Sequence, residues 1–391
     1  MRILHIIGTL DPAAGGPSES VRVLLSFGPL GYQGEVVTLD SPGEAFYKDI
    51  PFPVHAIGPT HTTYGINRKL YRWLKDNRDR FDGVVVNGLW QYCGLAAWLA
   101  FRGRKPYVVF THGMLDPYFK HAFPLKHAKK WIYWVLAEYW VLRDAYRVLF
   151  TTAEEARLAE QSFWLHTWSG CVVPYGASRP PKDGETLREA FFSAHPELRG
   201  KRFMLYLGRI HRKKGCDMLI RAFVKLAALD PELQLVMAGP DQQSWSRDLQ
   251  EILTAAGLSE RVHWPGMLTG DVKWGSFFAS EVFILPSHQE NFGIAVAEAL
   301  ACGRAVLLSD KVNIAQEIAG DGAALIQPDT QEGTENLIRG WMEMSPAERG
   351  KMDAQAEKTF EERYDMRKNA VTIIELFETA SAGGGEQTAG G

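Results

Sequence analysis

The stretch Val-Phe-Ile-Leu-Pro-Ser-His-Gln-Glu-Asn-Phe-Gly-Ile-Ala-Val-Ala-Glu-Ala-Leu-Ala spans residues 282–301 and contains the unit that predicts the fold. Its first five residues form an apolar run with the length of a fully buried strand. A polar loop follows and leads directly into small, apolar residues with the length of a helix. A buried strand that passes through a short loop into a helix is the repeating unit of a doubly wound parallel sheet.

Apolar runs of the same kind recur along the chain, separated by longer stretches of helical periodicity. In the first half they fall at residues 3–7, 36–39, 84–87, 107–111 and 148–152. In the second half they fall at 203–207, 233–238, 262–264, 282–286, 305–309 and 323–326. Because the pattern begins twice, we predict an α/β protein with two doubly wound, Rossmann-like domains facing a central cleft.

The expected domain boundaries follow from composition. An N-terminal domain covers 1–178, and a polar, proline-bearing linker covers 179–200. A C-terminal domain covers 201–360, and the helix at 361–379 joins the first domain. The tail 380–391 is rich in Gly, Ala and Ser, which is typical of disorder.

Composition limits the class of protein. A chain of 391 residues with 46% hydrophobic and 23% charged residues is expected to be soluble and globular, and the net charge of -3 gives no reason to expect nucleic-acid binding. The four scattered cysteines contain no CxxC pair, which predicts neither a zinc site nor a disulfide framework. The N-terminal apolar run is too short for a signal peptide, and residues 131–142 are too few to span a bilayer. We therefore expect a cytoplasmic protein.

The loop and helix of the opening stretch carry two carboxylates. Glu290 lies at the mouth of the predicted helix, and Glu298 lies about two turns inside it among small apolar residues. A carboxylate in such a setting needs a partner, and ribose hydroxyls are suitable ones. The N–H groups around Asn291, Phe292 and Gly293 could bind sugar hydroxyls or phosphate. The alternative is an exposed Glu298.

A basic loop follows the first strand of the second half. Residues 209–214 place four cations within six positions. Arg209 can hold phosphate oxygens with a planar fork, and Lys214 can add a point charge. The alternative is a solvated basic loop, which describes Arg212 and Lys213 better than it describes the other two.

A glycine turn follows the first strand of the chain. Gly15 and Gly16 precede a helix, so the backbone could approach an anion closely near the helix N-terminus. The spacing is not that of the dinucleotide fingerprint G-x-G-x-x-G. The alternative, a plain turn with Ser18 as the helix N-cap, carries equal weight.

A histidine follows another strand of the first half. His112 comes directly after residues 107–111 and before Gly113. A lone histidine is more often structural than catalytic, but its place at a strand end makes the two interpretations about equal.

Taken together, these motifs resemble a known family. The E-x7-E spacing of Glu290 and Glu298, with Gly208-Arg209 and Lys214-Gly215, resembles the retaining glycosyltransferases of family 4, which have the GT-B fold. The resemblance covers nearly the whole chain and implies that the N-terminal domain binds the acceptor and the C-terminal domain binds the donor. It implies the following roles: Gly15 and Gly16 approach the donor diphosphate; Arg209 and Lys214 hold it; Glu298 binds ribose; Glu290 lies near the transferred sugar; His112 lies beside the reacting centre; Gly239, Met267 and Leu268 lie near the nucleotide.

The resemblance also implies a reaction. A sugar moves from a UDP- or GDP-sugar to a hydroxyl of a glycan or polyprenyl-linked acceptor in bacterial polysaccharide assembly, with retention of configuration. No metal and no cofactor are expected, and the chain contains no D-x-D spacing of the kind that metal-dependent transferases use. Because no enzymic nucleophile is evident, same-face attack by internal return is the preferred hypothesis.

Residues 118–134 mix four lysines with aromatic residues and contain no acidic residue. Such a segment could lie on an anionic membrane surface with Trp and Tyr at the interface. The alternative, a solvated helix whose aromatic side chains fill the domain core, carries equal weight.

Other classes of function compete with the transferase. An epimerase-like protein or a glycan phosphorylase could share the fold, although nothing in the sequence requires a pyridoxal-phosphate lysine. A non-catalytic, two-domain sugar-nucleotide-binding protein is the rival from another class. A dinucleotide dehydrogenase is disfavoured because the G-x-G-x-x-G turn is absent.

Overall fold

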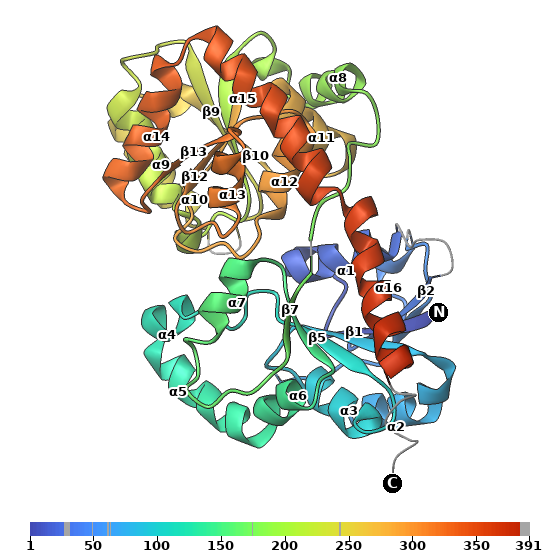
Figure 1. Ribbon diagram of the computed structural model, residues 1–391. Coiled ribbons are helices and arrows are strands. Elements are labelled where there is room, and N and C mark those ends of the chain that lie inside the picture. Colours follow the sequence, from blue (N-terminus) through green and yellow to red (C-terminus); the bar gives the residue numbers. More distant parts are fainter. Residues whose placement is uncertain are drawn as a thin grey trace. The chain divides into compact units, whose positions relative to one another are not determined.

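The computed structural model describes residues 1–26, 32–48, 50–60, 62, 64–173, 175–241 and 244–383. The chain divides into two compact units (Figure 1). One contains Met1–Tyr175 and the C-terminal segment from Met366, and the other contains Gly176–Asp365. The polypeptide therefore passes from one unit to the other twice, after Tyr175 and after Asp365.

Within the described residues, the first unit is built on a seven-stranded parallel sheet with the order β3-β2-β1-β4-β5-β6-β7. The strands are β1 (Arg2–Ile7), β2 (Gln33–Thr38), β3 (Val54–Ala56), β4 (Gly83–Asn87), β5 (Tyr107–Phe110), β6 (Arg147–Phe150) and β7 (Gly170–Val172). The helices are α1 (Gly16–Ser26), α2 (Arg68–Asn77), α3 (Tyr92–Phe101), α4 (Tyr118–Ala122), α5 (Pro124–Tyr133), α6 (Tyr139–Arg143), α7 (Ala153–Ala159) and α16 (Met366–Gly383).

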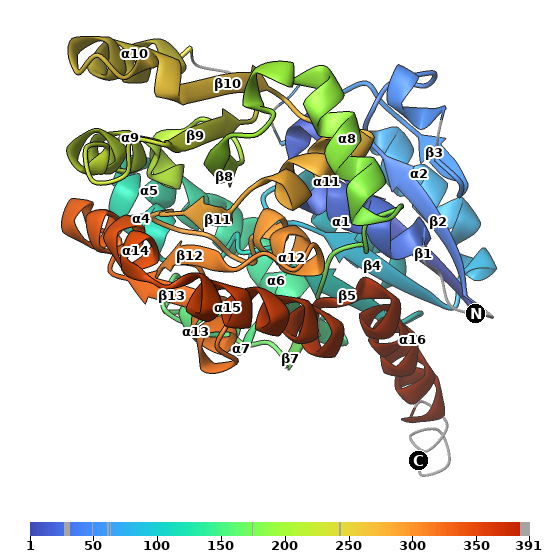
Figure 2. The same cartoon turned by 90° about the horizontal axis from the view of Figure 1, so that it is seen from above.

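The second unit has, in the part that the structure describes, a six-stranded parallel sheet with the order β10-β9-β8-β11-β12-β13 (Figure 2). Its strands are β8 (Arg202–Leu207), β9 (Leu233–Ala238), β10 (Val262–Gly266), β11 (Val282–Leu285), β12 (Val306–Ser309) and β13 (Ala324–Gln327). The helices are α8 (Gly184–Ala194), α9 (Cys216–Leu226), α10 (Ser246–Ala255), α11 (Gly270–Ala279), α12 (Ile294–Ala301), α13 (Ala315–Gly320), α14 (Gln331–Glu343) and α15 (Pro346–Thr359).

The two doubly wound units confirm the predicted α/β class with two Rossmann-like domains. Every residue of β4, β5, β9, β11 and β12 is buried, as expected for parallel strands that helices cover on both faces. All eleven apolar runs of the sequence form strands. Two further strands, β3 and β7, were missed, because each is a three-residue edge strand whose residues are not fully buried. Their sequences therefore lack the apolar pattern that marks the central strands.

Helix α8, helix α16 and the C-terminal tail lie at or near the predicted domain boundaries. Helix α8 lies within residues 179–200, which we expected to be a linker, and it packs against α11 in the second unit. Gly275 permits this packing, since a Cβ there would lie 2.0 Å from the Leu187 carbonyl oxygen. Helix α16 packs on the first unit, where Phe377 is buried beside Gly83. It continues to Gly383, and residues 384–391 of the expected tail lie outside the described residues.

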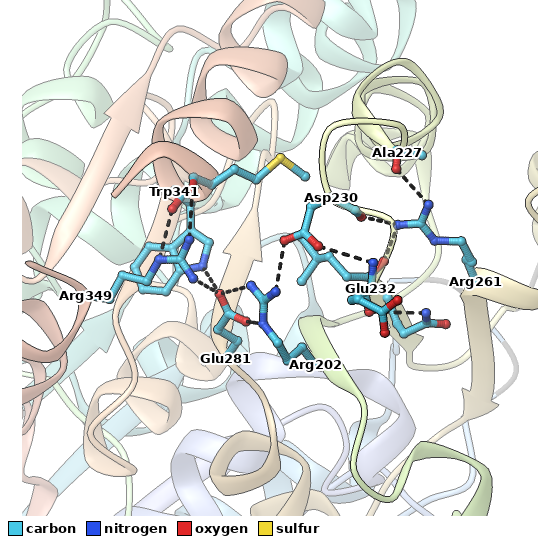
Figure 3. Close-up of polar contacts among 11 residues, drawn as sticks. Arg202, Ala227, Asp230, Glu232, Arg261, Glu281, Trp341 and Arg349 are labelled. Carbon is cyan, nitrogen blue, oxygen red and sulfur yellow. Dashed lines mark hydrogen bonds and ion pairs between the residues drawn. The ribbon is translucent and has the colours of Figure 1, made fainter. Parts of the chain in front are cut away.

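A charge cluster lies at the amino ends of β8 and β11 in the second unit. Glu281 accepts hydrogen bonds from Arg202 Nε at 2.8 Å and from Trp341 Nε1 at 2.9 Å, and it also pairs with Arg349 (Figure 3). Ligands of doubly wound sheets bind at the carboxyl ends of the strands, so this cluster faces away from the expected ligand edge. Its role is therefore structural.

Replacing Glu281 with alanine should lower the free energy of unfolding of the second unit by about 2–3 kcal/mol, because it removes charged hydrogen bonds from Arg202 and Arg349 and the bond from Trp341. Urea denaturation measures this loss. Glu232→Ala, at an exposed acid in the same region (Figure 3), should stay within about 0.5 kcal/mol of the parent protein. Equal stability of the two variants would contradict the structural role.

Candidate functional site

The loops that follow the strands of the second unit are joined by backbone hydrogen bonds. Gly208 N donates to Ala238 O at 3.0 Å, Gly239 N donates to Gly266 O at 2.7 Å, and His288 N donates to Lys213 O at 2.9 Å. The loops after β8, β9, β10 and β11 therefore form one edge of the sheet, which we call the strand-end loops. Parallel strands bring their carboxyl ends to a common edge, where doubly wound folds bind ligands.

Lys214 and Glu290 form an ion pair at this edge, although 76 positions separate them in the sequence. Gly215 sets the lysine in place: its φ of 68° lies in the left-handed region, and a Cβ there would lie 2.1 Å from Pro286 O. The basic loop therefore packs directly against the end of β11. Burial lowers the pKa of Lys214 to about 7, with the charges of Lys213 and Arg209 acting in the same direction. An anion in contact with the Lys214 ammonium, such as the Glu290 carboxylate, favours the protonated form and therefore raises the pKa of Lys214.

The backbone of Glu290 is held by the loop after β12. Glu290 N donates to Lys311 O at 2.9 Å, and Asn313 N donates to Glu290 O at 3.0 Å. The side chain of Asn313 also donates to Asn291 Oδ1 at 3.4 Å. Our sequence reasoning missed this loop, although its position directly after a predicted strand was a usable signal.

Glu298 is buried on α12 and accepts a hydrogen bond from Lys273 Nζ at 2.6 Å. We expected the buried carboxylate to have a partner, and the predicted partners were ribose hydroxyls. The structure shows that Lys273 of α11 is a partner within the protein. Burial of Glu298 alone therefore does not establish ribose binding. The exposed alternative for Glu298 is wrong.

Helix α12 begins at the strand-end loops, directly after Gly293, which adopts a φ of 77°. The N-cap residue Gly293 has no side chain to bond the first N–H groups of this helix, so these groups can donate to an anionic or hydroxyl-bearing ligand. Phe292 is buried against Tyr364, with ring centroids 5.7 Å apart. It supports the loop from behind rather than presenting a ring to solvent.

The remaining predicted residues of the second unit differ in exposure. Arg209 is exposed in the loop after β8, where its carbonyl oxygen accepts a hydrogen bond from Tyr206. Among the described residues, no acidic side chain forms an ion pair with Arg209. Met267 is exposed after β10, whereas Leu268 is almost fully buried.

His112 follows β5 in the first unit and adopts a φ of 48°. Its ring stacks on Phe110 at 4.7 Å between centroids, and its Nε2 lies 3.3 Å from Asn87 Oδ1. Burial lowers the pKa of His112 to about 3, so the imidazole is neutral at physiological pH. A neutral ring at a strand end can orient a hydroxyl group but carries no charge of its own.

Glu155, which we did not single out in the sequence, holds the backbone around His112. Its Oε1 accepts hydrogen bonds from Gly113 N and Thr111 Oγ1, both at 2.6 Å. Its Oε2 accepts from Thr151 N and Thr151 Oγ1, both at 2.7 Å. This buried carboxylate ties the loop after β5 to the end of β6. No local sequence signal distinguishes it from other glutamates in first helical turns.

The glycine turn of the first unit differs in detail from the alternative that we considered. Helix α1 begins at Gly16, and Gly15 adopts a φ of 93°. Ser18 is inside the helix and donates to Thr9 O at 2.9 Å, so it is not the N-cap. No described atom lies within 4 Å of the Cβ position of either glycine, which leaves their backbone accessible from that side.

Comparisons with known proteins agree with this arrangement. The family model for group 1 glycosyl transferases matches residues 188–359, and the model for the glycosyl transferase 4-like domain matches residues 19–176. The D-inositol 3-phosphate glycosyltransferase of Thermomonospora curvata is 31% identical over 44% of this chain and 43% of its own length. The phosphatidyl-myo-inositol mannosyltransferase of Mycolicibacterium smegmatis is 28% identical over 47% of this chain and 46% of its own length. The matched region thus spans less than half the length of these relatives.

Solved structures share the fold at low sequence identity. HepE of Anabaena in complex with UDP-glucose has a TM-score of 0.76 at 17% identity and covers 97% of this chain and 100% of its own. Sucrose-phosphate synthase from Thermosynechococcus elongatus has a TM-score of 0.75 at 19% identity, with 98% and 99% covered. Because two consecutive family models account for both units and the fold agrees over nearly the whole length, this chain belongs to the family 4-type glycosyltransferases of the GT-B fold.

Proposed function

We propose that this protein is a retaining, metal-independent glycosyltransferase that moves a sugar from a UDP- or GDP-sugar to a hydroxyl group of a glycan or lipid-linked acceptor in bacterial glycoconjugate assembly. One observation carries the proposal. Lys214 and Glu290, 76 positions apart, meet at the carboxyl ends of the strands, beside Arg209 and the uncapped start of α12. Cations and free N–H groups suit a diphosphate, and a carboxylate suits sugar hydroxyls.

The roles follow from the chemistry of the groups. Lys214 and Arg209 stabilise the negative charge that grows on the leaving diphosphate. Glu290 and Asn291 orient the transferred sugar, and Glu298 binds the ribose. In the first unit, His112 orients a reacting hydroxyl, and the turn at Gly15–Gly16 contributes the backbone N–H of Gly16, since that of Gly15 donates to Pro12 O.

The proposed reaction balances without an enzymic nucleophile. The bond between the anomeric carbon and the β-phosphate oxygen breaks, and its electron pair stays on the phosphate. The acceptor oxygen then attacks the same face of the sugar, and its proton passes to the departing phosphate oxygen. A covalent sugar–protein adduct, detected by mass spectrometry with a slow fluorinated donor, would contradict this internal-return mechanism.

A panel of ligands tests the proposal. UDP, GDP, ADP and their sugars are compared by thermal shift, and a nucleotide preferred by the folded protein raises the melting temperature by mass action. The matching nucleotide sugar is then incubated with candidate acceptors in the presence of EDTA. We expect nucleotide release that depends on the acceptor and is unchanged by EDTA. Loss of transfer in EDTA that Mg²⁺ restores would contradict metal independence.

The same assay separates the rival functions. A non-catalytic sugar-nucleotide-binding protein would give a thermal shift without nucleotide release under any condition. An epimerase-like enzyme would convert the nucleotide sugar in the absence of an acceptor. Only a transferase releases the nucleoside diphosphate together with a glycosylated product.

We also propose that a lipid-linked acceptor is reached at an anionic membrane surface, the cytoplasmic face of the cell membrane. None of the helices in the described ranges is long and apolar enough to cross a membrane. Around α5, the exposed apolar side chains are Leu125 at 87%, Leu136 at 72% and Trp164 at 80%, together with Phe123, Ile132 and Val135. Lys126 and Lys129 are exposed on the same helix. An apolar surface flanked by cations fits anionic headgroups.

The structure corrects the residues that would form this surface. The interfacial interpretation would place the Trp and Tyr residues of 118–134 at the membrane, but Trp134 is fully buried and stacks on Phe163 with 4.1 Å between centroids, as the alternative of aromatic side chains that fill the domain core predicts. Trp131 and Tyr133 are half-buried. Aliphatic residues of 123–136 and the more distant Trp164 are exposed instead.

Flotation with vesicles tests the membrane surface. The protein should float with vesicles containing phosphatidylglycerol but not with pure phosphatidylcholine, because the lysines require anionic lipid. The triple change Leu125→Ser, Ile132→Ser and Leu136→Ser should abolish flotation, whereas Leu229→Ser, at an exposed leucine of the second unit, should have no effect. If the parent protein does not bind anionic vesicles, the interfacial proposal fails.

A further inference from the structure

We propose that Asn87 and His5 are positioning residues for His112: a hydrogen-bonded relay fixes the His112 ring as the tautomer with its proton on Nε2 and leaves Nδ1 as an acceptor for a ligand hydroxyl. The relay runs from His112 through Asn87 and His5 to Tyr32. The inference rests on the proposed function only in taking His112 as a catalytic residue.

The orientation of the Asn87 amide follows from its neighbours. Nδ2 lies 3.4 Å from Val85 O, and a carbonyl oxygen can only accept a hydrogen bond. The nitrogen therefore faces Val85, and the same nitrogen lies 3.4 Å from His5 Nδ1, to which it donates. Amide orientation is assigned from such a network, and here the carbonyl acceptor determines it.

The tautomer of each imidazole follows from that orientation. Asn87 Oδ1 can only accept, so His112 Nε2, at 3.3 Å, carries a proton and donates it. His5 Nδ1 accepts from Asn87, so the proton of the neutral His5 ring is on Nε2. That nitrogen donates to Tyr32 Oη at 2.6 Å. Every polar atom of the relay thus has one consistent role.

An amide suits this position because it orients a ring without charging it. Burial lowers the pKa values of both His5 and His112 to about 3, and for His5 the proximity of His112 adds to the effect. A carboxylate at position 87 would favour the imidazolium form of both rings. The asparagine holds the ring of His112 in place while both histidines stay neutral.

The ring and the backbone of His112 are fixed by separate groups. Glu155 holds the backbone at Thr111 and Gly113, whereas Asn87 contacts the ring. Among the described residues, no group donates to His112 Nδ1, so this nitrogen keeps its capacity to accept. The two supports can therefore be tested separately by substitution.

Asn87→Asp is the sharpest variant, since it keeps the shape of the side chain but removes the donor and adds a charge. We expect kcat to fall about 100-fold, because the carboxylate favours the imidazolium form of His112, whose protonated Nδ1 can no longer accept from a ligand hydroxyl. The thermal shift produced by the nucleoside diphosphate should not change. Asn77→Asp, the same change at the end of α2, should keep the parent kcat. His5→Gln retains an acceptor and a donor and should keep most activity, whereas His5→Leu and Asn87→Ala each break the relay and should lower kcat.

The tautomer itself is read by long-range ¹⁵N–¹H correlation spectra of the full chain labelled at histidine nitrogens, with His112→Gln as the assignment control. We expect His112 to show a protonated Nε2 and an unprotonated Nδ1, and we expect this signature to be lost in Asn87→Asp. A proton on Nδ1 in the parent protein would overturn the relay. The relay would also be overturned if Asn87→Asp and Asn87→Ala both kept the parent kcat while His112→Ala was inactive. If His112→Ala itself retains kcat, the proposed catalytic role of His112 fails, and the spectra still decide whether the relay exists.

Discussion

Replacing Lys214 with alanine should lower kcat for sugar transfer by about 100- to 1000-fold, the usual effect of removing one group that stabilises charge in a transition state. The expected effect is large because the Lys214 ammonium is mostly buried and fixed against Glu290, so no water-exposed cation can replace it. Steady-state kinetics with the nucleotide sugar from the ligand panel measures the loss.

The adjacent lysine provides the matched control. Lys213→Ala removes the same charge from the same loop, but the contacts of Lys213 with Ser287 and His288 use its carbonyl oxygen, which the substitution retains. We expect its kcat to stay within a few-fold of the parent value. Equal losses in the two variants would show that only the general positive potential matters, and the specific role of Lys214 would be wrong.

The lowered pKa of Lys214 adds a pH dependence with a defined sign. The pKa is about 7 in the free protein, and contact with a diphosphate favours the protonated amine, so the pKa rises on binding. Affinity for the nucleoside diphosphate is therefore fully present below pH 7 and falls as the pH rises above 7, and binding above pH 7 takes up a proton. Calorimetry at pH 8 in buffers of different ionisation enthalpy measures this uptake. Lys214→Arg, which keeps the charge but does not titrate, should abolish it.

Replacing Glu298 with glutamine should produce two losses with different causes. The half-buried Lys273 would lose its carboxylate partner, which should lower the free energy of unfolding of the second unit by about 1–3 kcal/mol. If Glu298 also binds ribose, the nucleotide loses hydrogen bonds to a charged group. The free energy of nucleotide binding should then become less favourable by about 1.5–3 kcal/mol, which lowers the affinity about 10- to 100-fold. Urea denaturation and calorimetry measure the two effects separately.

A double variant separates these causes. Glu298→Gln combined with Lys273→Met removes both charges, so folding stability should recover, as it often does when a complete buried pair is replaced. Nucleotide affinity should remain low, because the Glu298 carboxylate that accepts from ribose is still absent from the double variant. Recovery of both stability and affinity would show that Glu298 serves only to pair with Lys273.

Much of the fold could be predicted from the sequence because parallel strands buried on both faces leave a continuous apolar run in the chain. All eleven predicted runs form strands. The same argument explains the misses, since β3 and β7 are short edge strands without that pattern. Residues directly after the apolar runs, among them Lys214, Glu290 and His112, could be singled out because parallel strands bring such positions to one edge.

Contacts within each unit could not be predicted in the same way. Ser18 resembles an N-cap in the sequence, but it is inside α1 because the helix begins at Gly16. Trp134 resembles an interfacial residue, but it is fully buried because Phe163, from a different segment, stacks on it. A residue type and its neighbours in the chain do not show which distant side chain comes to lie against it.

The sequence by itself determined the two doubly wound units and the E-x7-E, Gly-Arg and Lys-Gly motifs, because burial periodicity and spacing along the chain are local properties. Only the tertiary structure decided the partners. Glu290 meets Lys214 across 76 positions, Glu298 meets Lys273 across 25, and Asn87 meets His5 across 82. Each pair lies on two different strands, loops or helices, and the packing of those elements brings the two side chains together. Glu298 was therefore identified from the sequence, but its partner within the protein was found only in the fold.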